Sequence, residues 1–278
     1  MDDIQYFITV SETLNITRAS EIIGISQPAL SYAVKRLENK LGGQLFIRLK
    51  NGMRLTKLGE EFKKRSRRLL YEWEQAQNLA NPESDLIQGS YTIAVHPSVA
   101  LYTLECFMPK LQVEFPGLDY NFIHGLSREM VEKVISWEAD FGIVVNPIQH
   151  PDLVIRKLCH DEVTIFYAKN AQDKLIYDKN LAQSQDILKK IDKKINFNAV
   201  LSSTNLEVVA KLTSLGLGYG LLPTRVASQY KHLKKLKDAP IFKDEVCLVY
   251  RPEKHNNHVS KKIIHIIRSS VSIDKVQI

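Results

Sequence analysis

The chain has 278 residues, of which 44% are hydrophobic and 25% are charged, values typical of a soluble globular protein with two or three domains. No apolar run approaches the ~20 residues that a membrane-spanning helix needs, and the acidic N-terminus MDDIQYF is unlike a secretory signal. We therefore expect a cytoplasmic protein without membrane contacts. The three cysteines lie far apart and form no Cys-x-x-Cys pair, which argues against a disulfide framework and a structural zinc site.

Positive charge is concentrated near the N-terminus. Residues 35–68 contain twelve lysines and arginines but only three glutamates, a net charge of +9. The whole chain carries +7, so the other residues together carry −2. A basic segment of this kind suits binding to phosphates, although a solvated basic surface is the simpler alternative.

Three short helices are predicted before residue 42. The first begins at Asp2 and Asp3, whose charges suit a helix N-terminus. Its inner face is predicted to consist of Ile4, Phe7, Ile8, Ser11 and Leu14. The second has Asn15 or Thr17 as its N-cap, Ala19, Ile22 and Ile23 on its inner face, and Gly24 at its end.

The third helix is capped by Ser26 and tolerates Pro28 in its first turn. Its buried stripe is predicted to consist of Leu30, Val34, Leu37 and Leu41. Two helices joined by a tight turn predict a helix-turn-helix, whose second helix enters the major groove of DNA. A helical hairpin used only for packing is the structural alternative. The side chains off the stripe, which we expect to face the bases, are Gln27, Ser31, Tyr32 and Lys35.

The next segment, LFIRLKNGMRLT, predicts a β-hairpin that turns at Asn51-Gly52. Arg48, Lys50 and Arg54 alternate with apolar residues and give this hairpin a basic face. The hairpin indicates a winged helix-turn-helix whose wing contacts the DNA backbone or the minor groove.

Residues 1–62 resemble the DNA-binding domain of LysR-type transcriptional regulators. The matching motifs are Phe7, Thr17 with Ala19 and Ser20, SQPALS from Ser26, the segment from Leu37 to Arg48, and the segment from Leu55 to Gly59. We count Thr17, Arg18 and Pro28, which lie in these motifs, among the expected DNA-binding residues. After Ser31 the family usually has an arginine that reaches the bases, whereas this chain has Tyr32, so we expect a less common operator preference.

From Thr56, a long helix is predicted to run toward Asn81-Pro82. Its apolar positions Phe62, Leu69, Trp73 and Ala76 form a seam like that of a coiled coil, which suits either packing within the chain or pairing with a second copy. We favour pairing, and the family resemblance implies homodimers or homotetramers. The expected domains are a DNA-binding domain (1–58), a linker helix (59–88) and a regulatory domain (89–278).

Beyond residue 89, strands alternate with helices, which predicts βαβ units around a mainly parallel sheet. This α/β region resembles the family's effector-binding domain, with two lobes like those of periplasmic solute-binding proteins. Lobe I is expected at 89–160 and 247–278, and lobe II at 161–246.

Small polar residues follow several of these strands. Ligands of open α/β sheets bind beyond the carboxyl ends of strands, where helix N-termini offer N–H donors. Each residue alone is most simply a helix N-cap, but together they indicate a polar or anionic small effector between the lobes. The expected effector-binding residues are Ser98, Ser127, Asn146, Ser202, Ser203 and Thr204, with Arg128 as a candidate charge partner.

No set of residues indicates catalysis, a metal site or a cofactor. The glycine-rich GLGYG segment follows a helix and precedes a strand, the reverse of a dinucleotide-binding motif. Cys106 and Cys159 are candidate oxidant sensors, but their flanking residues are more typical of packing.

We therefore expect a transcriptional regulator rather than an enzyme, with operator DNA, a small effector, a second copy and RNA polymerase as its candidate partners. Two alternatives stay open: a small-molecule binding protein with incidental DNA contacts, and a DNA-binding protein whose cleft senses nothing.

Overall fold

The computed structural model describes residues 1–50, 52–79, 89–191 and 197–271. The chain forms two compact units, one of Met1–Asp85 with Ser136–Glu138 and the other of Leu86–Ile135 with Ala139–Ile278. Each unit is described separately below. The long helix predicted to link the domains belongs to the first unit.

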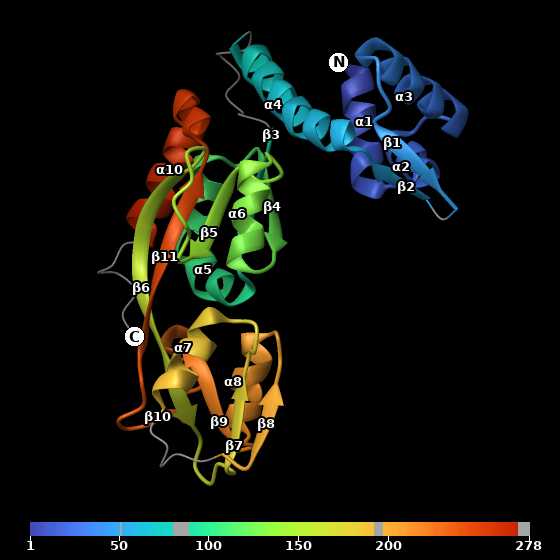
Figure 1. The fold of residues 1–278 in the computed structure, drawn as a ribbon. Coiled ribbons are helices and arrows are strands. Elements are labelled where there is room, and N and C mark those ends of the chain that lie inside the picture. Colours follow the sequence, from blue (N-terminus) through green and yellow to red (C-terminus); the bar gives the residue numbers. More distant parts are fainter. Residues whose placement is uncertain (51, 80–88, 192–196, 272–278) are drawn as a thin grey trace. The chain divides into compact units, whose positions relative to one another are not determined.

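Three helices open the first unit: α1 (Asp2–Thr13), α2 (Ile16–Ile23) and α3 (Gln27–Leu41) (Figure 1). The side chain of Asn15 accepts a hydrogen bond from the N–H of Arg18 and so caps α2, and Ser26 caps α3 in the same way through the N–H of Ala29. Gly24, at φ 78°, ends α2 in the left-handed conformation that glycine adopts without strain. The predicted helix-turn-helix is confirmed.

The core of this unit is built around Phe7, which is fully buried with Leu30 of α3 and Leu45. Three predicted positions of the inner faces are wrong, because Ile22, Leu41 and Leu14 are 64%, 40% and 39% exposed. Each lies at the C-terminal end of a helix, where the chain turns away and the inner face ends.

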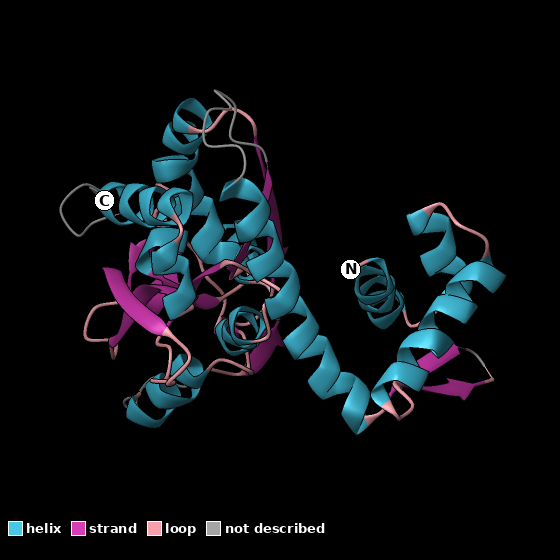
Figure 2. Ribbon diagram, turned by 90° about the horizontal axis from the view of Figure 1, so that it is seen from above, coloured by secondary structure: helices cyan, strands magenta, loops and turns pink. Residues whose placement is uncertain are grey.

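The hairpin consists of β1 (Phe46–Leu49) and β2 (Gly52–Leu55) and lies beside the helices (Figure 2). Leu49 pairs with Gly52, so Gly52 belongs to the second strand, whereas the predicted turn residue Asn51 lies outside the described residues. Gly52 has φ 131°, and a Cβ there would lie 3.0 Å from the carbonyl oxygen of Leu14. The next N–H, that of Met53, donates to the same oxygen over 2.9 Å, so glycine allows the wing to dock against the end of α1.

Helix α4 (Lys57–Leu79) begins where predicted. The hydroxyl of Thr56 accepts a hydrogen bond from the N–H of Gly59 (2.9 Å) and donates one to the carbonyl oxygen of Gln44 (2.7 Å). The predicted stop at Asn81-Pro82 lies outside the described residues.

The second unit contains one curled sheet with the strand order β4-β3-β5-β11-β6-β9-β7-β8, and β10 pairs with β6. Its strands are β3 (Gly89–Val95), β4 (Leu118–His124), β5 (Phe141–Val145), β6 (Val154–Tyr167), β7 (Lys174–Tyr177), β8 (Ala199–Ser202), β9 (Tyr219–Pro223), β10 (Lys234–Lys235) and β11 (Phe242–Tyr250). Its helices are α5 (Pro97–Glu114), α6 (Ser127–Ile135), α7 (Ala182–Lys190), α8 (Leu206–Ser214), α9 (Thr224–Ala227), the 3₁₀ helix η1 (Pro252–Asn256) and α10 (His258–Ser270).

The two ends of this sheet are parallel, and its middle is antiparallel. Strands β4, β3 and β5 pair in parallel in one lobe, and β9, β7 and β8 do so in the other. The long strands β6 and β11 pair antiparallel between them and run from one lobe into the other (Figure 1). The predicted two-lobed α/β architecture is confirmed, and the expected lobe boundaries at 160/161 and 246/247 fall inside these two shared strands.

Several elements of the second unit were not predicted from the sequence. They are the strands β7 and β10, the helices α7 and α9 and the 3₁₀ helix η1. Each lobe has a hydrophobic core of its own. Phe141 and Tyr250 are buried in lobe I, and Ile176 and Leu222 are buried in lobe II.

Candidate functional site

The exposed surface of α3 carries the predicted base-contacting residues. Gln27, Pro28, Tyr32 and Lys35 are exposed, and Ser31 is half-buried. At 3.6 residues per turn these five positions span an arc of roughly 140°, opposite the buried Leu30, Ala33, Val34 and Leu37. The tyrosine is 68% exposed, which is unusual for a large aromatic side chain. The structure therefore brings these residues together on one helix face.

Basic side chains flank this face. Thr17 and Arg18 are exposed in the first turn of α2, and Arg48, Lys50 and Arg54 are exposed on the hairpin. Within the described parts of the chain, no ion pair involves Arg18, Lys35 or these three hairpin residues. Their charges are thus available to phosphates.

Other basic residues of the 35–68 segment are engaged within the protein. The guanidinium of Arg36 donates to the carboxylate of Asp3, with 3.0 Å between Nε and Oδ2, and this bond lowers the pKa of Asp3. The same guanidinium lies 5.7 Å from the centre of the Tyr32 ring. Lys40 also approaches Asp3, with 3.7 Å between Nζ and Oδ2. Charge counting along the sequence therefore overestimates the free positive charge.

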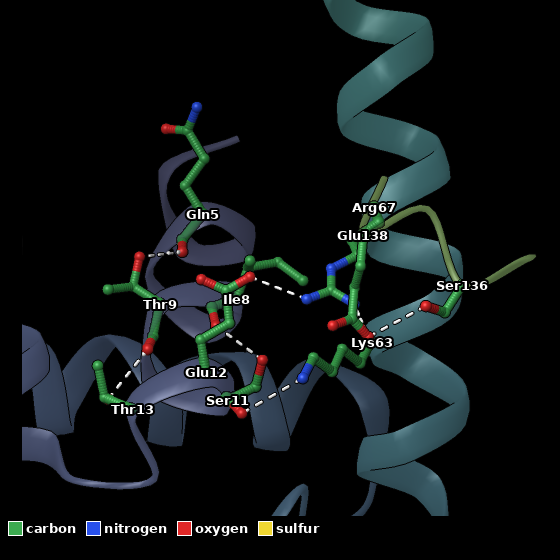
Figure 3. Close-up of polar contacts among 10 residues, drawn as sticks. All are labelled: Gln5, Ile8, Thr9, Ser11, Glu12, Thr13, Lys63, Arg67, Ser136 and Glu138. Atoms are coloured by element: carbon green, nitrogen blue, oxygen red, sulfur yellow. Dashed lines mark hydrogen bonds and ion pairs between the residues drawn. The ribbon is translucent and has the colours of Figure 1, made fainter. Parts of the chain in front are cut away.

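Helix α4 is held to α1 by polar contacts (Figure 3). Arg67 pairs with Glu12 (2.8 Å), and the ammonium of Lys63 donates to the carbonyl oxygen of Ser11 (3.4 Å). Arg67 also pairs with Glu138 (2.7 Å), one of the three later residues that belong to this unit. Burial lowers the pKa of Lys63. These two cations serve the fold of the first unit.

The predicted seam of α4 divides into two parts. Phe62 packs on the core of its own unit, with its ring 5.0 Å from that of Phe7. Leu69 and Trp73 are 48% and 46% exposed, and Ala76 is exposed as well. Of the predicted seam residues, those that are exposed therefore begin at Leu69, in the fourth turn of α4.

The second unit contains a cavity of about 660 Å³ to which both lobes contribute. Lobe I supplies His96, Ser98, Val99 and Tyr102 near the start of α5, Leu126, Ser127, Arg128 and Glu129 at the start of α6, and Val145 and Asn146 at the end of β5. The rest of the lining comes from the shared strands and lobe II, and includes Asp161, Val163, Gln183, Leu206, Leu221, Phe242, Asp244 and Val246.

Three of the predicted effector-binding residues, Ser98, Ser127 and Asn146, line this cavity. The structure does not bring the other three into its lining. Ser202 ends β8, and the hydroxyl of Ser203 accepts from the N–H of Asn205 over 3.1 Å. Thr204 also lies outside the cavity lining, and it does not cap α8, whose N-cap is Asn205.

A hydrogen-bond network fixes the polar side of the cavity. The hydroxyl of Ser127 accepts from the N–H of Val145 (3.0 Å), and Asn146 donates from Nδ2 to Oδ1 of Asp244 (2.7 Å). Gln183 donates from Nε2 to both oxygens of the same carboxylate, each over 3.1 Å. Burial raises the pKa of Asp244.

None of the lining residues Asp161, Gln183 and Asp244 was predicted from the sequence. The two acids could have been found from the alternation of side chains along a strand, because residues two positions apart share a face. Asp161 is on the same face as the buried Val163 and Ile165, and Asp244 is on the same face as the buried Val246 and Leu248. An acid at a buried position of an apolar strand is rare unless it has a partner. Gln183 gave no such signal.

The cysteines are in settings that suppress thiolate formation. Cys159 and Cys247 are buried and Cys106 is half-buried, and all three are free. Burial raises the pKa of each, to about 11 for Cys247. Oxidation of a thiol proceeds through the thiolate, so these settings disfavour a sensing role.

Over the described residues, no three His, Cys, Asp or Glu side chains gather in a way that would hold a metal ion. Among the helices that the structure describes, none combines the length and hydrophobicity that crossing a bilayer requires.

Known proteins match this chain over almost its whole length. Residues 1–60 match the model of the bacterial regulatory helix-turn-helix proteins of the lysR family, and residues 84–272 match that of the LysR substrate binding domain. The HTH-type transcriptional regulator GltR of Bacillus subtilis is 24% identical over 252 residues, covering 86% of this chain and 84% of GltR.

Solved structures share the fold. A full-length OxyR variant from Pseudomonas aeruginosa superposes with a TM-score of 0.73 at 20% identity, covering 97% of this chain and 93% of OxyR. Full-length CbnR in complex with its target DNA gives a TM-score of 0.52 at 18% identity, covering 98% and 99% of the two chains. With a winged helix-turn-helix, a two-lobed substrate-binding domain and family matches over both, the chain belongs to the LysR family of DNA-binding transcriptional regulators.

Proposed function

We propose that α3 lies in the major groove of an operator and reads it with Gln27, Ser31, Tyr32 and Lys35. Gln pairs bidentately with adenine, Ser donates or accepts, and Lys binds guanine or a phosphate. Pro28 lies on the same face, and Thr17 and Arg18 lie at the start of α2. We expect these three residues to contact the sugar-phosphate backbone. The observation that carries the proposal is the exposure of one polar helix face next to basic side chains without ion pairs in the described structure.

The hairpin extends this surface. Arg48, Lys50 and Arg54 bind the backbone or the minor groove, where arginine and lysine contribute affinity more than sequence preference. We expect the salt dependence of binding to reflect these contacts, because each neutralised phosphate releases counterions.

Two copies of the chain pair through α4. The exposed Leu69, Trp73 and Ala76 lie 4 and 3 residues apart, the spacing of a coiled-coil seam. Phe62 is left out of the proposed seam because it packs on Phe7. A dimer places two recognition helices in successive major grooves, roughly 34 Å apart. We further propose that the dimers can form homotetramers, that the protein contacts RNA polymerase and that it works in the cytoplasm.

A small molecule in the cavity of the second unit controls activity. We propose that this molecule contacts Ser98, Ser127 and Asn146, which line the cavity. The other three predicted effector-binding residues, Ser202, Ser203 and Thr204, are left out because they do not line it. A ligand changes DNA binding only through different affinities for two arrangements of the oligomer. A LysR-type chain that binds DNA and senses nothing is the remaining alternative.

The test is a titration of the full-length protein with its own upstream DNA and with a scrambled sequence, at several salt concentrations. We expect selective binding that weakens as salt rises. Lys35→Ala should lower the salt slope by about one, and Gln27→Ala should cost about 1–3 kcal/mol at one base position. Lys211→Ala, at an exposed position of the second unit, is the matched control. Equal affinity for scrambled DNA would contradict the proposal.

A further inference from the structure

Two buried carboxylates face each other across the central strands of the second unit. Asp161 of β6 and Asp244 of β11 are direct partners in the antiparallel register. They are 7% and 4% exposed, and both line the cavity. Opposite residues of such a pair have Cβ atoms roughly 4.5–5.5 Å apart, and like charges there are destabilising. An arrangement that costs stability and lies in a cavity points to a binding role.

The two carboxylates differ in their hydrogen bonds. Both oxygens of Asp244 accept from amide side chains, as described above. Oδ1 of Asp161 accepts from the N–H of Glu162 (2.8 Å), whereas its Oδ2 is buried without a hydrogen-bond partner among the described residues. The hydroxyl of Ser98 is likewise buried and unpartnered there, and it lines the same cavity. A ligand with N–H donors would satisfy both of these groups.

The other charges around the pair do not cancel it. From α9, the guanidinium and the backbone of Arg225 favour the ionised form of Asp161, and this one positive charge offsets only one of the two carboxylates. The same guanidinium donates from Nη2 to the carbonyl oxygen of His160 (3.2 Å) and lies 5.3 Å from the centre of the Tyr102 ring. From the start of α6, Arg128 and Glu129 have opposite charges.

The two remaining titratable residues of the cavity lining, His96 and Tyr102, add no positive charge. Burial lowers the pKa of His96, which favours the neutral imidazole, and raises that of Tyr102 well above its usual value. The cavity therefore has an excess of negative charge on the side of the shared strands.

A cation that donates hydrogen bonds fits this site better than a bare metal ion. Metal sites generally need at least three protein ligands, and no such group of His, Cys, Asp or Glu exists in the described structure. A primary ammonium has three N–H donors and bonds well to carboxylates. The cavity wall next to the acids is apolar, with Val163, Leu221 and Phe242, and suits a short alkyl chain.

We propose that the cavity binds a small organic ammonium ion, a primary amine on a short apolar chain, between Asp161 and Asp244. This inference rests on the proposed effector function of the cavity and names the chemical class of the effector. It replaces the anionic effector that the polar strand ends suggested. Because β6 and β11 run through both lobes, neutralising the pair acts on the two strands that join them.

The experiment uses the full-length protein at pH 7.5 with n-butylamine, 4-aminobutanoate, butyrate and tetramethylammonium as probes. Binding is measured by thermal shift and calorimetry. We expect n-butylamine to raise the melting temperature in a concentration-dependent way. Tetramethylammonium has the charge but no N–H donor and should have no effect, and butyrate has the opposite charge. 4-Aminobutanoate tests whether an added carboxylate strengthens binding, which would mark an amino acid rather than a simple amine as the source.

Asp161→Asn and Asp244→Asn should each weaken n-butylamine binding roughly 10- to 100-fold, the effect of removing one charged hydrogen-bond partner. Asp173→Asn, at an exposed position of the same unit, is the matched control and should leave binding unchanged. Without any probe, Asp161→Asn should melt no lower than the wild type, which separates lost binding from lost folding.

The outcomes distinguish this inference from the proposed function. If butyrate binds and n-butylamine does not, the cavity is an effector site but the inference is wrong. Failure of both amines, or binding that survives both substitutions, also overturns it. If n-butylamine binding depends on Asp161 but the protein shows no selective DNA binding, the inference stands and the proposed function fails.

Discussion

Replacing Asp161 by asparagine should stabilise the second unit at neutral pH. Burial raises the pKa of Asp161 to about 6, against 3.8 for an ordinary aspartate. The folded state therefore binds more protons than the unfolded state between about pH 4 and pH 6, so this group makes stability fall as pH rises through that window. At about 1.4 kcal/mol for each unit of pKa, the loss above pH 6 is about 3 kcal/mol.

Asp161→Asn removes that loss and also the repulsion with Asp244, while the new amide nitrogen can donate to the Asp244 carboxylate. We expect the free energy of unfolding to rise by about 1–3 kcal/mol at pH 7.5 and by much less at pH 4.5. The measurement is urea unfolding followed by far-UV circular dichroism at both pH values. The tryptophans, Trp73 and Trp137, both belong to the first unit, so their fluorescence provides an internal control that should not change.

Two results would refute this reasoning. One is a variant less stable than the wild type at pH 7.5, which would mean that the carboxylate is satisfied in the folded state. The other is an equal difference at both pH values, which would mean that the effect does not come from ionisation. Asp173→Asn should show no difference at either pH.

Three further predictions concern the first unit. Tyr32→Arg should change the preferred operator in a binding-site selection, and an unchanged preference would show that this position does not touch bases. Gly52→Ala should destabilise the unit by about 1–3 kcal/mol in tryptophan-detected unfolding, because of its φ of 131° and the nearby carbonyl of Leu14; Gln5→Ala is an exposed control in the same unit. Trp73→Glu should dissociate the dimer in sedimentation experiments without unfolding the unit, and an unchanged mass would refute the proposed seam.

Local signals explain why the first unit could be predicted well. The capping hydrogen bonds of its helices join residues no more than five positions apart, so short stretches of sequence contain them. The capping residues are Asn15, Gly24, Ser26 and Thr56. Ile22 was misassigned because apolar periodicity does not show where a helix face loses its partner.

Long-range pairings explain what could not be predicted. The ion pair of Arg36 with Asp3 joins residues 33 positions apart, so a count of charges along the chain cannot reveal it. Asp161 and Asp244 become neighbours only through the register of β6 and β11, which are separated by most of lobe II. The small polar residues at strand ends were visible in the sequence, but which of them face a shared cavity depends on the curl of the sheet.

The contacts between α1 and α4 have a geometric consequence for operator recognition. The first half of α4 is held to α1 by the contacts Arg67–Glu12, Lys63–Ser11 and Phe62–Phe7. We therefore expect α3, which is proposed to enter the major groove, and α4, which is proposed to form the dimer, to move together. In a dimer joined through Leu69 and Trp73, sliding the partner by one helical turn would shift each reading helix by roughly 5.4 Å along the axis of α4. The distance between the two half-sites that a dimer can bind would then change in discrete steps, so the register of the paired α4 helices would determine the spacing of the operator half-sites.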